Sequence, residues 1–346
     1  MATLAQLPLP ALERVPGFDA LGDEWDELAE ANGSVFGTRE WLSLWWEHFG
    51  AGRELLLTAG RGGDGSLETI LPFYVERTRP LRIVRVLGQG PGDELGPIGD
   101  REVAGRALSR WAAATSFDLL VCQQLPGRGA WHRALPGGRL VAETGSPLLD
   151  FEGRDWDELL ATKSRNLREQ VRCRERNLQR DHEVAYRLVS GTDGLDEALD
   201  DLFRLHRLRW GTRTTFGRTE AFQRAFAAAA ADLGWLRLWL LDLDGSTAAA
   251  WLGFRYANAE FYYQAGRDPA HESSSVGFVL LSHTIRSAVE DGADEYRFLR
   301  GDEPFKYRFA SGDDGLETIV VARGAVGRAA LATARAARAA RCALRR

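Results

Sequence analysis

The chain has 346 residues, 45% of them hydrophobic and 27% charged, and a formal net charge of −5 at pH 7. This length is too great for one ordinary hydrophobic core and predicts two domains, and the composition is that of a soluble globular protein. No apolar stretch approaches the roughly 20 residues that a transmembrane helix needs, so we expect no membrane-spanning segment.

The first half predicts the order strand, two helices, three strands, helix and strand. A short strand near residues 12–18 precedes the helices LGDEWDELAEA and TREWLSLWWEHFG. ELLLTAG, LETILPFYVER and LRIVRVLG then read as strands, and the first two meet at Asp64-Gly65, a dipeptide typical of hairpins. After a loop, REVAGRALSRWAAA predicts a helix and FDLLVCQQ a strand.

The second half repeats this order. WDELLATKSRNLREQVRCRERNLQR predicts a long basic helix over residues 156–180, and HEVAYRLVS predicts a strand. The apolar spacing of LDEALDDLFRLHRLRW and TEAFQRAFAAAAADLG predicts two helices. WLRLWLLDL, STAAAWLGFRY and AEFYYQAG predict strands, with a second Asp-Gly turn at Asp244-Gly245. The helix VGFVLLSHTIRSAVEDG and the strands DEYRFL and LETIVVA end this half.

The two ends and the cysteines add to this picture. MATLAQLPLPALERV lacks the regions of a signal peptide, and Cys122, Cys173 and Cys342 match no disulfide framework or zinc spacing. We therefore expect a cytoplasmic protein with no metal. The last 25 residues contain seven arginines and no acid. A solvated helix end is one interpretation, and a basic arm that touches anionic lipid, RNA or a partner is the other.

This order of elements is that of the GNAT acyltransferase fold, and the sequence resembles CelD-like bacterial GNAT acetyltransferases. The architectural relatives of that branch are the Fem-type aminoacyl transferases, which carry two GNAT units in tandem. The resemblance rests on SRNLREQVR, LHRLRW, AAAWLGF, FYYQAGRD, SSVGFVLL and FLRGDEPFKYRF, best from residue 156 onward. It implies an α+β (mixed α/β) fold of two tandem GNAT-like units, each a mostly antiparallel twisted sheet flanked by helices. The expected domains are 1–150 (degenerate unit), 151–325 (acyltransferase unit) and a basic tail, 326–346.

The resemblance implies acetyl-CoA or another acyl-CoA as the donor. A GNAT fold binds the donor pyrophosphate at the N-terminus of the helix after its fourth strand, where free N–H groups attract anions. The expected cofactor-binding residues are Tyr262, Gln264, Ala265, Arg267, Ser274, Ser275, Val276, Gly277 and Phe278. The alternative is a plain serine cap, because this loop has fewer glycines than the usual GNAT loop.

Acyl transfer needs a base, a donor for the oxyanion and an acid for the thiolate. FLRGDEPFKYRF contains one of only two lysines in a chain of 44 basic residues. We expect Asp302 or Glu303 as the base, Lys306 as a charge at the reaction centre and Tyr263 or Tyr307 as the acid. The alternative is that these acids and cations only pair with each other on a solvated turn.

His206 lies on the apolar face of its predicted helix, which alone favours a core histidine. The resemblance places this helix beside the active cleft, so His206 is also a catalytic candidate. Arg209, Trp210, Tyr307 and Asp93 are the expected substrate-binding residues. Asp93 belongs to GQGPGDELGPIG, residues 88–99, which lacks the ending of a P-loop and favours a Pro- and Gly-rich turn.

Three functions stay open. The first is direct acyl-CoA-dependent N- or O-acyl transfer to a small molecule or a cell-envelope saccharide. The second is Fem-type transfer from aminoacyl-tRNA, which the tandem layout, the basic helix and Lys306 favour. The third is a non-catalytic GNAT-fold binding protein. Nucleic acid is expected as a partner only in the second, because the basic helix has no interleaved aromatic residues.

Overall fold

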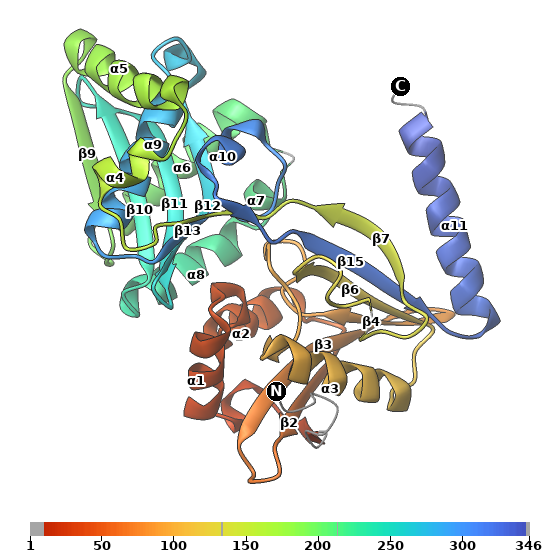
Figure 1. Ribbon diagram of the computed structural model, residues 1–346. Helices are drawn as coiled ribbons and strands as arrows, with labels where there is room; N and C mark the ends of the chain where they lie inside the picture. Colours follow the sequence, from red (N-terminus) through yellow and green to blue (C-terminus); the bar gives the residue numbers. More distant parts are fainter. Residues whose placement is uncertain (1–9, 133, 213, 344–346) are drawn as a thin grey trace. The chain divides into compact units, whose positions relative to one another are not determined.

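The structure is a computed structural model and describes residues 10–132, 134–212 and 214–343 (Figure 1). The described residues divide into two compact units. The first unit contains the residues up to Thr144 and those from Gly315 onward, and the second runs from Gly145 to Asp314. Each unit is built around one mixed β-sheet.

The sheet of the first unit has the strand order β1-β2-β3-β4-β6-β15-β7, with β5 paired to β3. Its neighbours are antiparallel except β4 and β6, which are parallel. The strands are β1 (Ala11–Val15), β2 (Glu54–Arg61), β3 (Leu67–Thr78), β4 (Leu81–Val86), β5 (Ile98–Gly99), β6 (Leu119–Pro126), β7 (Arg139–Thr144) and β15 (Leu316–Ala322). The helices are η2 (Phe18–Ala20), α1 (Asp23–Asn32), η3 (Val35–Gly37), α2 (Arg39–Phe49), α3 (Arg101–Ala114) and α11 (Gly324–Ala343).

The sheet of the second unit has the order β14-β8-β13-β12-β11-β10-β9 and is antiparallel except for the pair β12 and β13. The strands are β8 (Pro147–Asp150), β9 (Val184–Val189), β10 (Leu236–Leu243), β11 (Ser246–Tyr256), β12 (Ala259–Arg267), β13 (Glu295–Arg297) and β14 (Gly312–Asp313). The helices are α4 (Trp156–Ala161), α5 (Arg165–Asp181), α6 (Leu195–Trp210), α7 (Thr215–Arg218), α8 (Glu220–Asp232), η4 (Pro269–His271), α9 (Val276–Glu290) and α10 (Pro304–Phe309).

The two units repeat one topology. Each sheet contains five neighbouring strands in chain order that end in a parallel pair, β1-β2-β3-β4-β6 and β9-β10-β11-β12-β13. In the first unit the two-residue strand β5 intervenes between β4 and β6 in the chain. Helices separate the first two strands of each set, and one long helix, α3 or α9, precedes the last. The predicted mixed α/β fold, with the same order of elements in both halves, is confirmed.

The last strand of the chain differs from its prediction. The sequence placed Leu316–Ala322 at the end of the second half, but this strand, β15, pairs with β6 and β7 in the first sheet. The chain enters the second sheet after β7, through β8, and leaves it after β14, through β15. Both changes of sheet take two residues, which are too few for a sequence pattern to reveal. The boundaries of the functional domains at residues 150 and 325 stay a prediction.

Two helical segments also differ from their prediction. The long helix expected over residues 156–180 is two helices, because the Ser164 side chain accepts a hydrogen bond from the amide of Leu167, 3.2 Å away, and begins α5. The segment around Lys306, expected as a loop, contains the short helix α10. Pro304 begins it, because the fixed φ of proline suits the first helical position.

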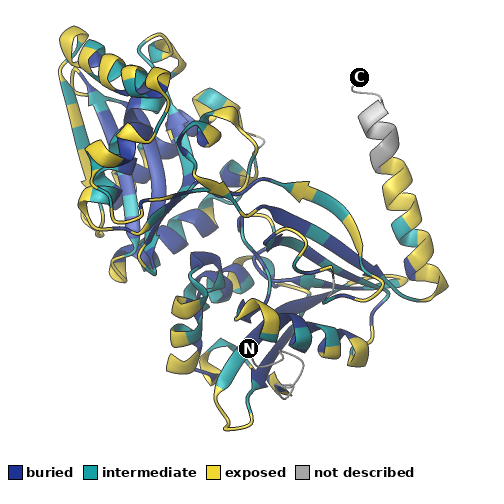
Figure 2. Cartoon of the chain, in the orientation of Figure 1, coloured by how far each residue is buried: buried dark blue, intermediate teal, exposed yellow. Residues whose placement is uncertain are grey.

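The second unit has helices on both faces of its sheet (Figure 1). Buried side chains of α4, α5 and α9 form one core cluster with the strands, including Leu160, Leu167, Trp251 and Ile285. On the other face, aromatic residues of α6, α7 and α8 stack on one another and on β11. Phe226, for example, meets Phe254 edge to face at 5.1 Å. Figure 2 shows the buried residues concentrated in the strands.

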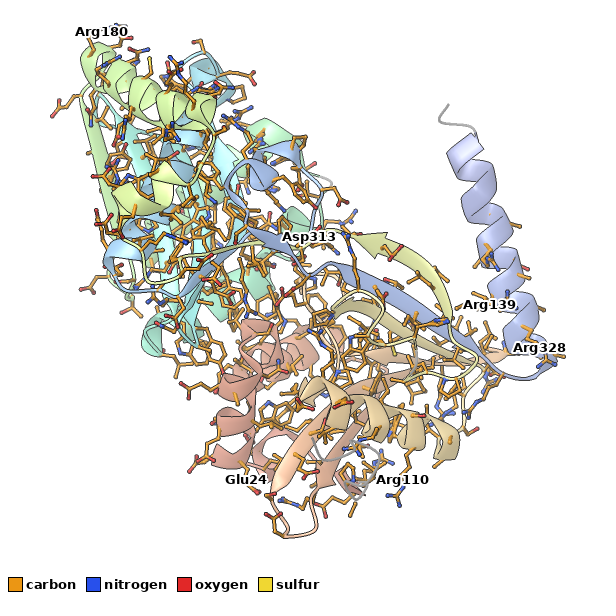
Figure 3. All side chains as sticks on the ribbon, in the orientation of Figure 1. Glu24, Arg110, Arg139, Arg180, Asp313 and Arg328 are labelled. Carbon is orange, nitrogen blue, oxygen red and sulfur yellow. The ribbon has the colours of Figure 1, made fainter. Side chains whose placement is uncertain are left out.

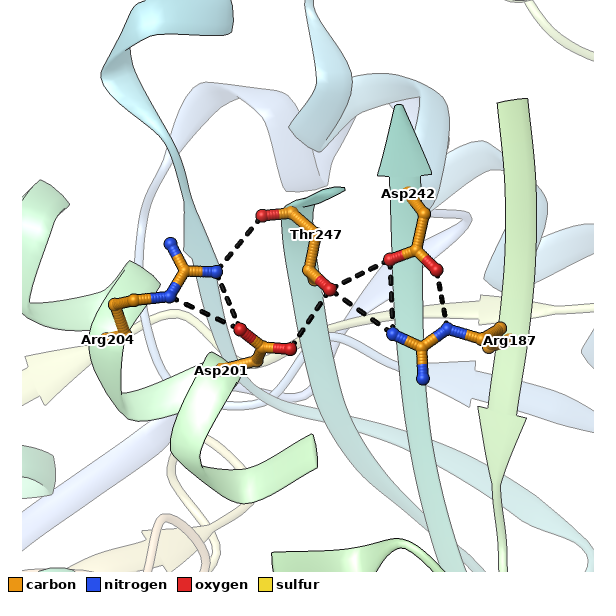
Figure 4. Close-up of polar contacts among 5 residues, drawn as sticks. All are labelled: Arg187, Asp201, Arg204, Asp242 and Thr247. Carbon is orange, nitrogen blue, oxygen red and sulfur yellow. Dashed lines mark hydrogen bonds and ion pairs between the residues drawn. The ribbon is translucent and has the colours of Figure 1, made fainter. Parts of the chain in front are cut away.

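A polar network fixes α6 against the edge of this sheet (Figure 4). The hydroxyl of Thr247 on β11 lies 2.8 Å from Asp242 on β10 and 3.0 Å from Asp201 on α6. Arg204 pairs with Asp201 at 2.6 Å, and Arg187 on β9 pairs with Asp242. Exposed single pairs contribute little to stability, but this network connects three strands to the helix whose last turn carries Arg209.

The basic tail forms α11. Arg323, just before it, lies over the ring of Phe117 at 4.2 Å and so anchors the start of the helix. A cavity of about 260 Å³ beside α11 is lined by Arg139, Arg328 and Arg335; Figure 3 labels the first two. Contact of the tail with an anionic surface stays a prediction, and residues 344–346 lie outside the described residues. Within the described ranges, no helix has both the length and the apolar character needed to cross a membrane.

Candidate functional site

The second unit contains a cavity of about 210 Å³ between the first turns of α9, the strands β11 and β12, and the helices α5, α6 and α10. Aromatic side chains make much of its wall: Trp251, Tyr262, Phe278 and Phe305. Four arginines and no acidic residue complete the lining. Apolar walls with only positive charges suit a ligand that has an apolar part and an anionic part.

The strand β12 leaves its parallel neighbour at this cavity. The pairing of β12 with β13 ends at Phe261 and Arg297, whereas β12 itself continues to Arg267. Residues 262–267 therefore have β11 on one side and no strand on the other. Such a strand edge can hydrogen-bond an extended ligand that carries amide groups.

The N-terminus of α9 has free amides beside the cavity. Ser275 precedes the helix in the left-handed region, at φ 56°, and its carbonyl accepts from the amide of Phe278 at 2.9 Å. Among the described residues, the amides of Val276 and Gly277 have no hydrogen-bond acceptor. A Cβ atom on Gly277 would stand 3.3 Å from Cδ of Arg267, so glycine keeps this space open. Two free N–H groups at a helix N-terminus favour an anion.

The arginines of the cavity differ in their partners. Arg267 forms an ion pair with Glu272 at 2.8 Å. Arg209 forms no hydrogen bond or ion pair with any described residue, and its guanidinium lies 4.4 Å from the ring centroid of Trp210. Burial lowers the pKa of Arg209. Arg209 is thus a partly buried cation that has no ion-pair partner among the described residues, although the charges of Glu272 and Glu303 act on its pKa.

Five of the nine predicted cofactor residues line this cavity: Tyr262, Ala265, Arg267, Gly277 and Phe278. The other four do not line it: Gln264 lies in the same strand, Ser274 and Ser275 lie in the loop before α9, and Val276 is the first residue of α9. The structure thus brings the strand β12 and the start of α9, separated by one short loop, to one cavity. The binding roles of these residues stay a prediction.

Tyr262 and Tyr263 lie on opposite faces of the sheet. Tyr262 lines the cavity, and its ring lies 6.0 Å from that of Phe305. Burial raises the pKa of Tyr262 to about 12. The Tyr263 hydroxyl accepts a hydrogen bond from Gln223 of α8, 2.9 Å away, and its ring faces Phe216 of α7. The structure therefore does not bring Tyr263, the expected acid, together with the cavity residues.

Lys306 fixes the loop that follows β13. Its ammonium donates to the carbonyl oxygen of Arg300 at 2.8 Å, lies 3.4 Å from that of Leu299, and pairs with Glu303 at 3.0 Å. Its side chain is only 5% exposed and does not line the cavity. A compact ammonium with three donors suits three acceptors, whereas a planar guanidinium does not. A catalytic role for Lys306 stays a prediction.

The expected base Asp302 and the expected substrate residue Tyr307 belong to one hydrogen-bonded cluster. Asp302 accepts the amide of Gly145 at 2.9 Å and lies 3.3 Å from the Tyr307 hydroxyl, which donates to Asp313 at 2.9 Å. Burial and the two carboxylates raise the pKa of Tyr307 to about 12. This cluster connects the segments before β8 and after α10, and none of its members lines the cavity.

Glu303, the other expected base, does not line the cavity, but its charge acts on residues that do. Its charge acts on the pKa values of two cavity residues, adding to burial in raising that of Tyr262 and opposing burial in the case of Arg209. Its side chain is 54% exposed.

The remaining candidates do not line the cavity either. His206 is buried against Phe216, with ring centroids 4.9 Å apart, and burial lowers its pKa to about 4, so the ring is neutral at pH 7. Trp210 is 55% exposed at the end of α6. Asp93 is buried in the first unit. Among the described residues, no group of three His, Cys, Asp or Glu side chains could hold a metal ion.

Sequence reasoning missed Arg174 and Arg308, which line the cavity. For Arg174 the sequence contains a signal. It lies three residues after Val171 and four before Leu178, both buried, so it shares the inward face of α5. For Arg308 there is none, because its position depends on the way α10 folds back after β13.

Comparison with known proteins agrees with this geometry. Residues 165–307 match the family described as an acetyltransferase (GNAT) domain. A search of curated proteins finds no significant match. Among solved structures, FemX is similar at 13% identity and a TM-score of 0.63, covering 90% of this chain and 97% of FemX.

Two further solved structures have this fold over most of the chain. One is the C-terminal domain of a putative lysylphosphatidylglycerol synthetase from Agrobacterium fabrum, at 13% identity and a TM-score of 0.57, covering 90% of this chain and 94% of that one. The other is L-PGS from Bacillus licheniformis, at 12% identity and a TM-score of 0.56. The similarity covers 91% of this chain and 95% of that one. The predicted fold of two tandem GNAT-like units is confirmed.

Proposed function

We propose that the second unit is an acyl-CoA-dependent transferase that moves an acyl group, acetyl in the first instance, directly to an amine or hydroxyl. The acceptor in this proposal is a small molecule or a cell-envelope saccharide. The cavity at the point where β12 leaves β13, beside the free amides of Val276 and Gly277, carries this proposal.

Each part of an acyl-CoA has a counterpart at the cavity. The diphosphate matches the two amides and the guanidinium of Arg267. The amide groups of the pantetheine arm match the edge of β12 over residues 262–267. The acyl end matches the aromatic wall formed by Trp251, Tyr262 and Phe305.

The reaction then needs few groups from the protein. The acceptor nitrogen or oxygen attacks the thioester carbon, the carbon–sulfur bond breaks, and coenzyme A leaves as the thiolate. Glu303 takes the proton of the acceptor. Tyr262, protonated at neutral pH because its pKa is about 12, donates a hydrogen bond to the sulfur as negative charge develops. Tyr262 replaces Tyr263 in this role because Tyr262 lines the cavity.

A Fem-type transferase that uses aminoacyl-tRNA is the second candidate. The segment 163–180, with seven basic residues and two acids, favours it. FemX has the same fold over 90% of this chain, which is consistent with either donor.

Melting temperature and tRNA retention distinguish the candidates. Acetyl-CoA at about 100 times its Kd should raise the melting temperature by roughly 5–10 °C, and uncharged tRNA should wash off at about 150 mM salt. If the protein retained tRNA at this salt concentration and acetyl-CoA did not raise its melting temperature, the second candidate would be favoured. If the protein shows neither response, the third candidate is favoured, a GNAT-fold protein that only binds another ligand.

A further inference from the structure

Two arginines from different helices meet over one aromatic ring in the cavity wall. Arg174 comes from α5 and Arg308 from α10, and both side chains are half-buried. Their guanidinium carbons lie 4.7 Å and 5.4 Å from the ring centroid of Phe278, the third residue of α9. Each cation–π contact is favourable, but together they bring two like charges close to one another.

In the part of the chain that the structure describes, no acid forms an ion pair with either arginine. Arg174 forms no hydrogen bond or ion pair with any described residue, and Arg308 donates to the neutral amide oxygen of Gln170 at 3.0 Å. Burial, together with the charge of Arg174, lowers the pKa of Arg308. Glu175 is adjacent to Arg174 in the chain but pairs with Arg286 at 3.4 Å. Two partly desolvated cations without a counter-ion are an arrangement suited to an anionic ligand.

We infer that Arg174 and Arg308 form a second anion subsite that takes the 3′-phosphate of a coenzyme A donor. This inference rests on the proposed function, since it requires the donor to be an acyl-CoA. Coenzyme A carries a diphosphate within its chain and a separate phosphate monoester on its ribose. The cavity has two cationic sets to match, the free amides at the start of α9 with Arg267, and the pair over Phe278.

The monoester suits the arginine pair better than the diphosphate does. A phosphate monoester carries between one and two negative charges near neutral pH and has three equivalent terminal oxygens. Two guanidinium groups can therefore each donate two hydrogen bonds to it. The subsite would select free coenzyme A over donors that lack the 3′-phosphate, including acyl groups held on the phosphopantetheine arm of a carrier protein.

Calorimetric titration with coenzyme A and dephospho-coenzyme A, which lacks only the 3′-phosphate, tests this inference. The intact protein should bind coenzyme A about 10- to 100-fold more tightly than dephospho-coenzyme A. In Arg174→Gln and in Arg308→Gln, coenzyme A should bind about 10-fold more weakly, with dephospho-coenzyme A changed less than about 2-fold. Arg172→Gln, an exposed arginine of the same helix, is the matched control and should change neither.

Each other outcome identifies what fails. Equal weakening of both ligands by Arg174→Gln would place the pair on the diphosphate and overturn the inference, while the proposed function would stand. If Arg172→Gln weakened coenzyme A binding as much as Arg174→Gln does, the effect would come from the overall positive charge of α5. That result would also overturn the inference. Failure of the intact protein to bind either ligand would remove the proposed function itself. Arg308→Lys, which keeps the charge, gives a second test if a glutamine variant does not fold.

Discussion

Lys306 and Glu303 form an ion pair one turn apart in the chain, with Nζ 3.0 Å from Oε2. The lysine side chain is 5% exposed and that of the glutamate 54%, so the pair extends from the interior to the surface. The same ammonium binds the carbonyl oxygen of Arg300. One lysine therefore fixes the loop between β13 and α10, and α10 brings Phe305 and Arg308 to the cavity.

Replacing Lys306 with methionine should lower the free energy of unfolding of the second unit by about 2–4 kcal/mol, because buried carbonyl oxygens would lose their donor. Urea denaturation followed by tryptophan fluorescence measures this. The matched control is Lys163→Met at the other lysine of the chain, which is half-buried and should cost less than about 1 kcal/mol. Equal losses in the two variants would contradict the role given to Lys306.

The two adjacent tyrosines should separate catalysis from stability. Tyr262→Phe should reduce thiol release from acetyl-CoA in the presence of acceptors by about 10-fold or more, with stability nearly unchanged. Tyr263→Phe should keep the rate within about 2-fold but cost about 1 kcal/mol of stability, because Gln223 loses its acceptor. The reverse pattern would return the acid role to Tyr263.

Glu260 should make stability depend on pH. It is 2% exposed, and its carboxylate lies 3.8 Å from Arg237 and 3.7 Å from Arg255, but burial raises its pKa from 4.5 to about 7. The folded state therefore holds this proton more tightly than the unfolded state does. The contribution of Glu260 to stability is greatest below pH 4.5 and is lost as pH rises through 7.

The variant Glu260→Gln isolates this effect. The free energy of unfolding of the variant minus that of the wild type should rise by up to about 3 kcal/mol between pH 4.5 and 8, measured by urea denaturation at each pH. Glu169→Gln, which removes an exposed pair with Arg165, should give a flat difference. A flat difference for Glu260→Gln as well would show that its pKa is not raised.

The sequence allowed the prediction of structural features that are determined by residues close together in the chain. The Asp-Gly turns, the apolar spacing of the helices and the loop before α9 are all local. Together with the resemblance to GNAT proteins, they led to the fold and to six residues of the cavity, the five cofactor candidates and Arg209. The place of β15 in the first sheet could not be predicted, because strand partners are chosen over long distances and a buried strand pattern fits either sheet.

The side chains of the site were harder to predict than its elements. Tyr262 and Tyr263 are neighbours of the same type, and the ladder with β11 shifts register between Leu252 and Gly253, so alternation along β12 does not indicate which tyrosine faces α9. The partners of Asp302 and Lys306 lie in loops whose paths depend on the whole unit. Composition drew attention to Lys306, but only the structure placed its ammonium on the loop carbonyls.

Calorimetric titration of acetyl-CoA tests the central claim, that the cavity beside α9 holds the acyl donor, most directly. We expect one site per chain with a Kd in the micromolar range. In Gly277→Trp the heat should disappear while the melting temperature is kept, because the indole would occupy the space before the free amides, where a Cβ already comes 3.3 Å from Arg267. Absence of binding by acetyl-CoA and by free coenzyme A, or equally tight binding to Gly277→Trp, would contradict the account.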